Sequence, residues 1–160
     1  MPPRRGQRPK PEKTAQQRAL ELLDRRDYSC AELIKKLLEK GESPEDAENA
    51  VSYLASLGFV DDQRYASLVV RQYAGKGYGA RRVRMELMRR GLSREIIDEA
   101  LGEMPAQDDT LDRLLAQKLR GGFDRADVKK ATDALVRKGY GYDEISAALR
   151  RLREALDAED

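Results

Sequence analysis

The chain has 160 residues, with 31 lysines and arginines against 29 aspartates and glutamates, no histidine and one cysteine. The lack of histidine excludes Ser-His-Asp and Cys-His catalytic arrangements and histidine-ligated zinc, and the single Cys30 excludes internal disulfides and thiolate metal cages. A charged fraction of 38% with few aromatic residues is typical of amphipathic helices. No apolar run approaches the roughly 18 residues that cross a bilayer, so we expect a cytoplasmic protein without a membrane partner.

The net charge of +2 is the sum of four blocks of alternating sign. Residues 1–13 carry +4, residues 14–70 carry −4, residues 71–94 carry +7 and residues 95–160 carry −5. The first block is Pro-rich and has no hydrophobic period, so we expect residues 1–14 to be a disordered basic tail. Such a tail fits either loose contact with nucleic acid or a solubilising role without a specific partner.

After the tail, helical signals follow one another along the chain. Apolar residues from Ala19 to Leu23 mark a first helix, and Ser29 is an N-cap signal for a second. Basic residues followed by Gly41 predict the end of that second helix, because cations and a left-handed glycine both suit a helix C-terminus. Ser43, followed by proline, predicts the start of a third helix.

The same helix–glycine–helix pattern occurs around Gly41, Gly91 and Gly139, which are 50 and 48 residues apart. Each of these glycines follows a leucine by four residues and precedes an alanine by nine. A further helix precedes each pair, and a fixed period of this length indicates stacked supersecondary units. We therefore predict an all-α fold of three tandem three-helix repeats that form an elongated, curved array. The predicted repeats are residues 15–60, 61–106 and 107–160.

Few residues are candidates for catalysis or for binding a metal or phosphate. The pairs Asp61-Asp62 and Asp108-Asp109 could supply oxygen ligands for magnesium, but both stand where a helix begins, and we interpret them as helix-capping signals. The three glycines of residues 75–79 lack the spacing of a phosphate-binding P-loop. We therefore expect no enzyme activity, no cofactor, no metal and no small-molecule substrate.

The strongest signal is the basic segment 71–94, in which Glu86 is the only acidic residue. Lysine and arginine neutralise phosphates, and the interleaved Tyr73 and Tyr78 could stack on bases, although packing between helices is the commoner role of such tyrosines. An acidic protein surface would suit the same charges, and a merely solvated basic face is the third alternative. The candidate contact residues for such a partner are Arg71, Lys76, Arg81, Arg82, Arg84, Arg89 and Arg90.

Several stretches in this order and spacing resemble the bacterial RecX family. They are RDYSCAEL (26–33) with KKLLEKG (35–41), LGFVDDQRYA (57–66), and GYGARRVRMEL (77–87) with RRG (89–91). LVRKGYGYDEISAAL (135–149) is similar to the closing unit of that family. The resemblance covers about residues 15–152.

This resemblance implies a non-enzymatic regulator of the RecA recombinase, built of three-helix repeats. Such proteins bind along the groove of the RecA–DNA filament, oppose its extension, and reduce ATP hydrolysis, strand exchange and the SOS response to DNA damage. The family contributes no catalytic residues. The expected partners are the RecA filament and DNA, bound directly or through the filament, and we expect a monomer. A general nucleic-acid-binding protein without RecA specificity, or an adaptor for an acidic protein, are the alternatives.

Overall fold

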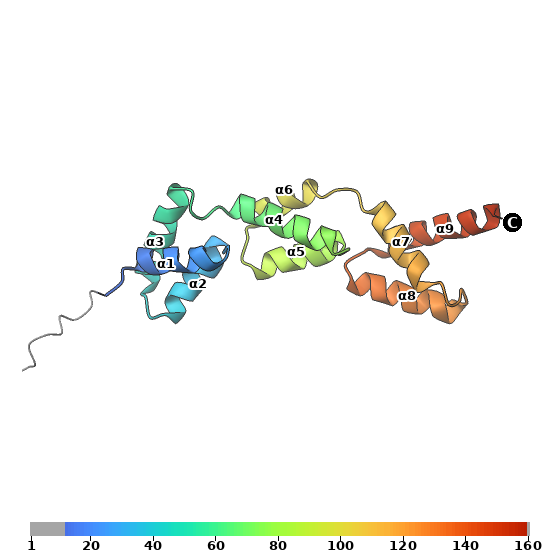
Figure 1. Ribbon diagram of the computed structural model, residues 1–160, viewed down its shortest axis with the longest axis horizontal. Helices are drawn as coiled ribbons and strands as arrows, with labels where there is room; N and C mark the ends of the chain where they lie inside the picture. Colours follow the sequence, from blue (N-terminus) through green and yellow to red (C-terminus); the bar gives the residue numbers. More distant parts are fainter. Residues whose placement is uncertain (1–11, 160) are drawn as a thin grey trace, which may run out of the picture. The chain divides into compact units, whose positions relative to one another are not determined.

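A computed structural model describes residues 12–159 of the chain (Figure 1). All regular secondary structure in this range is helical, which confirms the all-α prediction. Residues 1–11 of the predicted basic tail lie outside the described residues. The helices are α1 (Ala15–Arg25), α2 (Cys30–Glu39), α3 (Pro44–Ser56), α4 (Asp62–Gly75), α5 (Ala80–Arg89), α6 (Arg94–Gly102), α7 (Asp108–Lys118), α8 (Arg125–Arg137) and α9 (Tyr142–Ala158).

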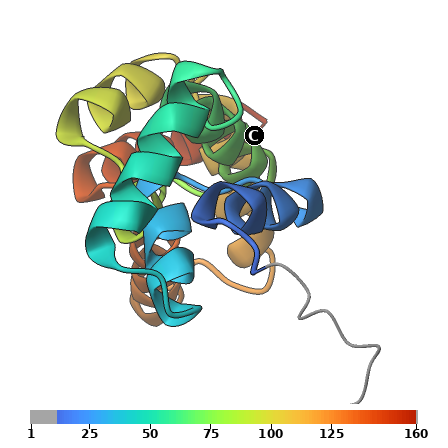
Figure 2. The same cartoon turned by 90° about the vertical axis from the view of Figure 1, so that its left-hand side faces the viewer.

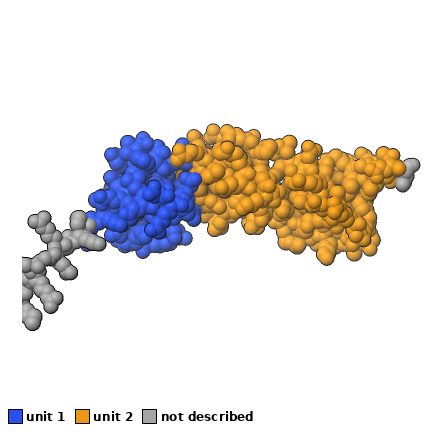
Figure 3. Space-filling model, in the orientation of Figure 1, with its two compact units in different colours: residues 1–61 blue, residues 62–160 orange. Residues whose placement is uncertain are grey.

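The chain divides into two compact units, residues 1–61 and residues 62–160 (Figure 3). In unit 1, the helices α1, α2 and α3 pack on one another around a single apolar cluster (Figures 1 and 2). Leu33 and Leu37 of α2 and Ala47 of α3 are fully buried in this cluster. The repeat of apolar residues every three to four positions thus puts one face of each helix into the core.

Unit 2 contains two further clusters of the same design. Helices α4–α6 enclose the first, in which Val83 and Leu87 are fully buried, as expected from the pattern of α5. Helices α7–α9 enclose the second, around Leu135, Tyr140 and Ile145. The tandem three-helix organisation is therefore present in the structure. The repeat boundaries and the elongated, curved form of the array stay predictions.

Local sequence signals act largely as predicted. Ser29, Ser43 and Ser93 are N-caps whose hydroxyls accept an amide hydrogen bond from the third residue of the following helix. The repeat glycine after α2 has a φ of 95°, and those after α5 and α8 have φ of 77° and 106°, in the left-handed region that favours glycine.

The aspartates at the start of α7 differ from the prediction in detail. Asp108 and Asp109 lie in the first helical turn, and the N-cap is Gln107, whose side chain makes no capping hydrogen bond. Their carboxylates can still interact favourably with the positive N-terminal end of the helix dipole. Asp62 likewise lies in the first turn of α4. Among residues 12–159, no helix is long and apolar enough to span a membrane.

Candidate functional site

The seven predicted contact residues all lie at the end of α4, in the α4–α5 turn, or on α5 and its C-cap. Arg90 is half-buried and the other six are exposed. Their side chains nevertheless fall into two groups, which differ in whether an acidic side chain of the same unit already pairs with them. That division decides which of the seven can offer positive charge to a partner.

Three of the arginines are engaged within the fold. Arg84 forms an ion pair of 2.9 Å with Asp98 of α6. Arg89 and Arg90 both bind the carboxylate of Glu86, one turn earlier on α5. Arg84 therefore joins α5 to α6, and the charge of all three arginines is partly neutralised.

Glu86 is the most buried charged residue among the described residues of this unit. Glu86 is only 6% exposed, and hydrogen bonds from Arg89 and Arg90 outweigh burial and lower the pKa of its carboxyl to about 2. Arg90 also donates to the hydroxyl of Tyr65 on α4 at 2.7 Å. Burial alone would lower the pKa of Arg90, but the hydrogen bonds to Glu86 and Tyr65 raise it above its usual range. Arg90 is thus a structural bridge between α4 and α5.

The other four basic residues keep their charge available. Arg71, Lys76, Arg81 and Arg82 are exposed, and none forms an ion pair with an acidic side chain within residues 12–159. Three of them surround the turn between α4 and α5. The charge of segment 71–94 is therefore concentrated at one end of α5.

The tyrosines of this turn pack against each other and against cations. The rings of Tyr73 and Tyr78 are tilted, with centroids 5.2 Å apart. Lys76 lies 5.8 Å from the Tyr73 ring, and Arg82 and Lys138 lie 5.7 and 5.1 Å from the Tyr78 ring. Both rings also pack on the apolar cluster of α4–α6. This geometry favours the packing interpretation over base stacking.

Lys138 belongs to the turn between α8 and α9, so two repeats meet at this point. The amide of Gly79 donates to the carbonyl of Lys138 at 2.9 Å, and the amide of Arg81 donates to that of Gly139 at 3.1 Å. The buried hydroxyl of Tyr140 donates to the carbonyl of Gly77 at 2.8 Å. Main-chain hydrogen bonds thus join the second and third repeats directly.

Both turns have the sequence KGYG, at residues 76–79 and 138–141. Their close approach requires glycine, because a Cβ at Gly79 would overlap the carbonyl of Gly139, and one at Gly139 would overlap the backbone of Arg82. The close approach of the two backbones therefore accounts for Gly79 and Gly139. We call Lys76, Arg81, Arg82 and Lys138 the junction cations. Sequence analysis missed Lys138, although the repeated tetrapeptide was a signal for it.

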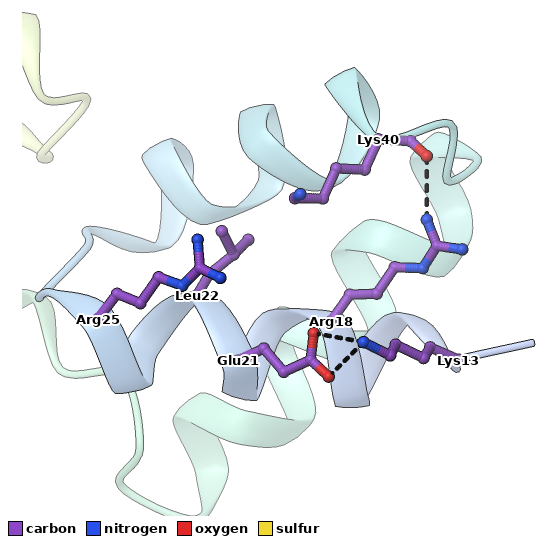
Figure 4. Close-up of a pocket in the computed structure, with 6 residues that line it drawn as sticks. All are labelled: Lys13, Arg18, Glu21, Leu22, Arg25 and Lys40. Atoms are coloured by element: carbon purple, nitrogen blue, oxygen red, sulfur yellow. Dashed lines mark hydrogen bonds and ion pairs between the residues drawn. The ribbon is translucent and has the colours of Figure 1, made fainter.

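Unit 1 contains a second group of basic residues, which the net charge of residues 14–70 did not indicate. A cavity of about 360 Å³ lies over Leu22, between α1 and the end of α2 (Figure 4). Lys13 pairs with Glu21 at 2.7 Å, and Arg18 donates to the carbonyl of Lys40 at 3.1 Å. The hydrogen bond from Lys13, with the nearby charges of Arg25 and Lys40, lowers the pKa of Glu21 despite slight desolvation. Residues 14–70 are acidic in total, yet here the fold gathers cations.

Comparison with known proteins agrees with this architecture. The family model described as "RecX, first three-helix domain" matches residues 15–54, and "RecX, second three-helix domain" matches residues 61–101. A regulatory protein RecX of Xanthomonas axonopodis pv. citri is 42% identical over 99% of this chain and 96% of its own length. One from Vibrio campbellii is 38% identical over 87% of this chain and 92% of its own length.

Solved structures show the same fold. The crystal structure of RecX from Lactobacillus salivarius superposes with a TM-score of 0.80 at 21% identity, covering 87% of this chain and 94% of that one. A second structure, of a regulatory protein RecX, gives 0.76 at 23% identity and covers 85% of this chain and 70% of the other. Since two family models match residues 15–54 and 61–101 and a relative is 42% identical nearly end to end, the chain belongs to the RecX family of regulatory proteins.

Proposed function

We propose that this protein binds the RecA–DNA filament in the cytoplasm and inhibits its extension, ATP hydrolysis and strand exchange. It would thereby modulate recombinational repair and the SOS response without being an enzyme. Membership of a family of regulatory proteins supports a regulatory role, and the family resemblance supplies RecA as the partner. Arg71, Lys76, Arg81, Arg82, Arg84, Arg89 and Arg90 are the proposed contact residues from the sequence, and Lys138 joins them.

The junction cations are the observation that carries the proposal. They are positive groups without ion pairs to residues 12–159, held on a junction that main-chain hydrogen bonds make rigid. A rigid cationic surface can steer and register a partner that presents acidic side chains or phosphates in a fixed arrangement. A filament of protein and DNA presents both. Within this proposal, Arg84, Arg89 and Arg90 contribute less, because each already has an acidic partner.

The test is a titration of the DNA-dependent ATPase of RecA with the purified protein, followed by filament lengths in electron micrographs. Wild type should reduce ATP turnover and shorten filaments. The double variant Arg81→Glu/Arg82→Glu should need about thirtyfold more protein, since each of the two lost charge contacts at a partly desolvated interface contributes roughly 1 kcal/mol. The matched control is Lys129→Glu/Lys130→Glu, an adjacent exposed pair on α8 with the same charge change.

Two outcomes would contradict the proposal. Unchanged ATP turnover and filament length with wild type in severalfold excess would exclude inhibition of RecA. Tight binding to bare DNA, with a steep salt dependence and no effect of RecA, would instead favour a general nucleic-acid-binding protein. Circular dichroism must show the same helical content for both double variants, because only then does the comparison report on contact with the filament.

A further inference from the structure

An apolar groove lies between α5 and α6, on the second repeat. Met88 of α5 forms one side, and Leu92 and Ile97, both buried in the α4–α6 cluster, form its floor. Arg84 and Arg94 also line the cavity, which has a volume of about 420 Å³. A space of this size accepts one large apolar side chain of a partner.

The methionines beside this groove are unusually exposed. Met85 is 64% exposed and Met88 is 62% exposed, and both lie on the same side of α5, three residues apart. Only Met88 is among the residues that line the groove. An exposed apolar side chain at a groove marks an interaction surface, and methionine adapts its shape to a partner more readily than other apolar residues. The fold itself does not need them there, because α5 is already anchored by Val83 and Leu87.

The rim of the groove is positively charged. The side chain of Arg94 is 91% exposed, and its 3.9 Å pair with Asp98 is at the limit of an ion pair. Arg84 binds the same carboxylate at 2.9 Å, so two arginines share one acidic group. An exposed pair of this kind contributes little to stability and leaves positive charge for a partner.

We propose that this groove binds an apolar side chain carried by an acidic segment of the filament protein, and that it does not bind DNA. This inference rests on the proposed function, because it takes the partner to be RecA. Binding in this groove is favourable when the partner buries hydrocarbon against Leu92, Ile97 and the thioether of Met88. The phosphate backbone of DNA has no apolar side chain to bury there. The basic residues 1–13 of this chain carry the wrong charge to occupy an arginine-lined groove.

The experiment compares Met88→Asp with Met85→Asp in the RecA ATPase titration. The two methionines lie on the same helix and are nearly equally exposed, and the two substitutions add the same charge. Only Met88 is among the residues that line the groove. Met88→Asp should raise the concentration for half inhibition about tenfold, equivalent to ~1.4 kcal/mol. Met85→Asp should change it less than about threefold, and Met88→Leu should restore inhibition. Binding of a fluorescent single-stranded oligonucleotide without RecA should be unchanged.

Each other outcome is informative. Inhibition by wild type and equally by Met88→Asp would overturn this inference and leave the proposed function intact. Equal loss in both variants would assign the contact to the α5 face and not to the groove, and a parallel loss of oligonucleotide binding would assign it to DNA. A wild-type dimer in sedimentation that Met88→Asp dissociates would mean that a second copy occupies the groove. No inhibition by wild type would contradict the proposed function, and with it this choice of partner.

Discussion

The amide of Gly79, the N-cap of α5, donates to the carbonyl of Lys138, the C-cap of α8, at 2.9 Å. The N-cap of α5 has no side chain to accept from the first amides of the helix, so the third repeat instead satisfies backbone groups around that start. In the same contact, carbonyls at the end of α8 gain the partners that the helix cannot give them. Two helix ends from different repeats thus complete each other.

Gly79→Ala should disrupt this junction. Its Cβ would overlap the carbonyl of Gly139, so the backbones must separate and break two hydrogen bonds. We expect the free energy of unfolding in urea to fall by about 2–3 kcal/mol. The control is Gly75→Ala at the end of α4, where a Cβ meets no atom within 4 Å. It should leave stability unchanged or raise it by about 0.5 kcal/mol. Equal stability of the two variants would contradict the role of the close approach.

Tyr140→Phe should cost about 1–2 kcal/mol at pH 7, because the buried carbonyl of Gly77 loses its donor. Burial, aided by the charge of Glu144, raises the pKa of Tyr140 above its usual 10. The unfolded chain therefore loses this proton first as the pH rises, and wild-type stability falls above about pH 10. Between pH 7 and pH 10.5, the free energy of unfolding in urea should fall less for Tyr140→Phe than for wild type. Tyr142→Phe, 60% exposed, is the control and should match wild type at both values.

Glu86→Gln should remove an acid-sensitive part of the stability. Since the pKa of Glu86 falls from 4.5 to about 2 on folding, its contribution is complete above pH 4.5 and is lost as the pH falls towards 2. We expect the variant to be less stable than wild type by roughly 2 kcal/mol at pH 7 and by progressively less below pH 4.5. Thermal melting from pH 7 to pH 2.5 measures this. The control is Glu99→Gln, exposed on α6, which should leave the dependence of thermal stability on pH unchanged. A difference in stability between wild type and Glu86→Gln that stays constant with pH would contradict the prediction.

Arg90→Ala and Arg71→Ala should separate structural from contact roles. Arg90 bridges Glu86 and Tyr65, so its loss should lower the free energy of unfolding by about 2 kcal/mol. Arg71 is exposed without an ion pair in the described chain, and its loss should change stability by less than about 0.5 kcal/mol. Urea denaturation gives both values. Comparable losses in the two variants would mean that the ion pairs do not divide the basic residues as we infer.

The repeats could be predicted because their signals are local. The serine caps, the glycine after each second helix and the spacing of leucines such as Leu37 and Leu87 all act within a few residues. The charge block 71–94 was also visible, because it is a property of composition.

The distribution of that charge was not predictable in the same way. The pair Arg84–Asp98 and the bond from Arg90 to Tyr65 join different helices, so no count of charges along the chain could separate them from Arg81 and Arg82. Nor could the negative sum over residues 14–70 show the cations that gather around Glu21. These features depend on the packing of helices, which sets distances that sequence separation does not.

The shared helix ends have a consequence for cooperativity. The amide of Arg81 lies in the second repeat, but its acceptor lies in the third. Its protection from hydrogen exchange should therefore follow the opening of the α8–α9 turn as closely as that of its own helix. The second and third repeats would then unfold locally as one cooperative unit, so a partner that binds at the junction would stabilise both repeats.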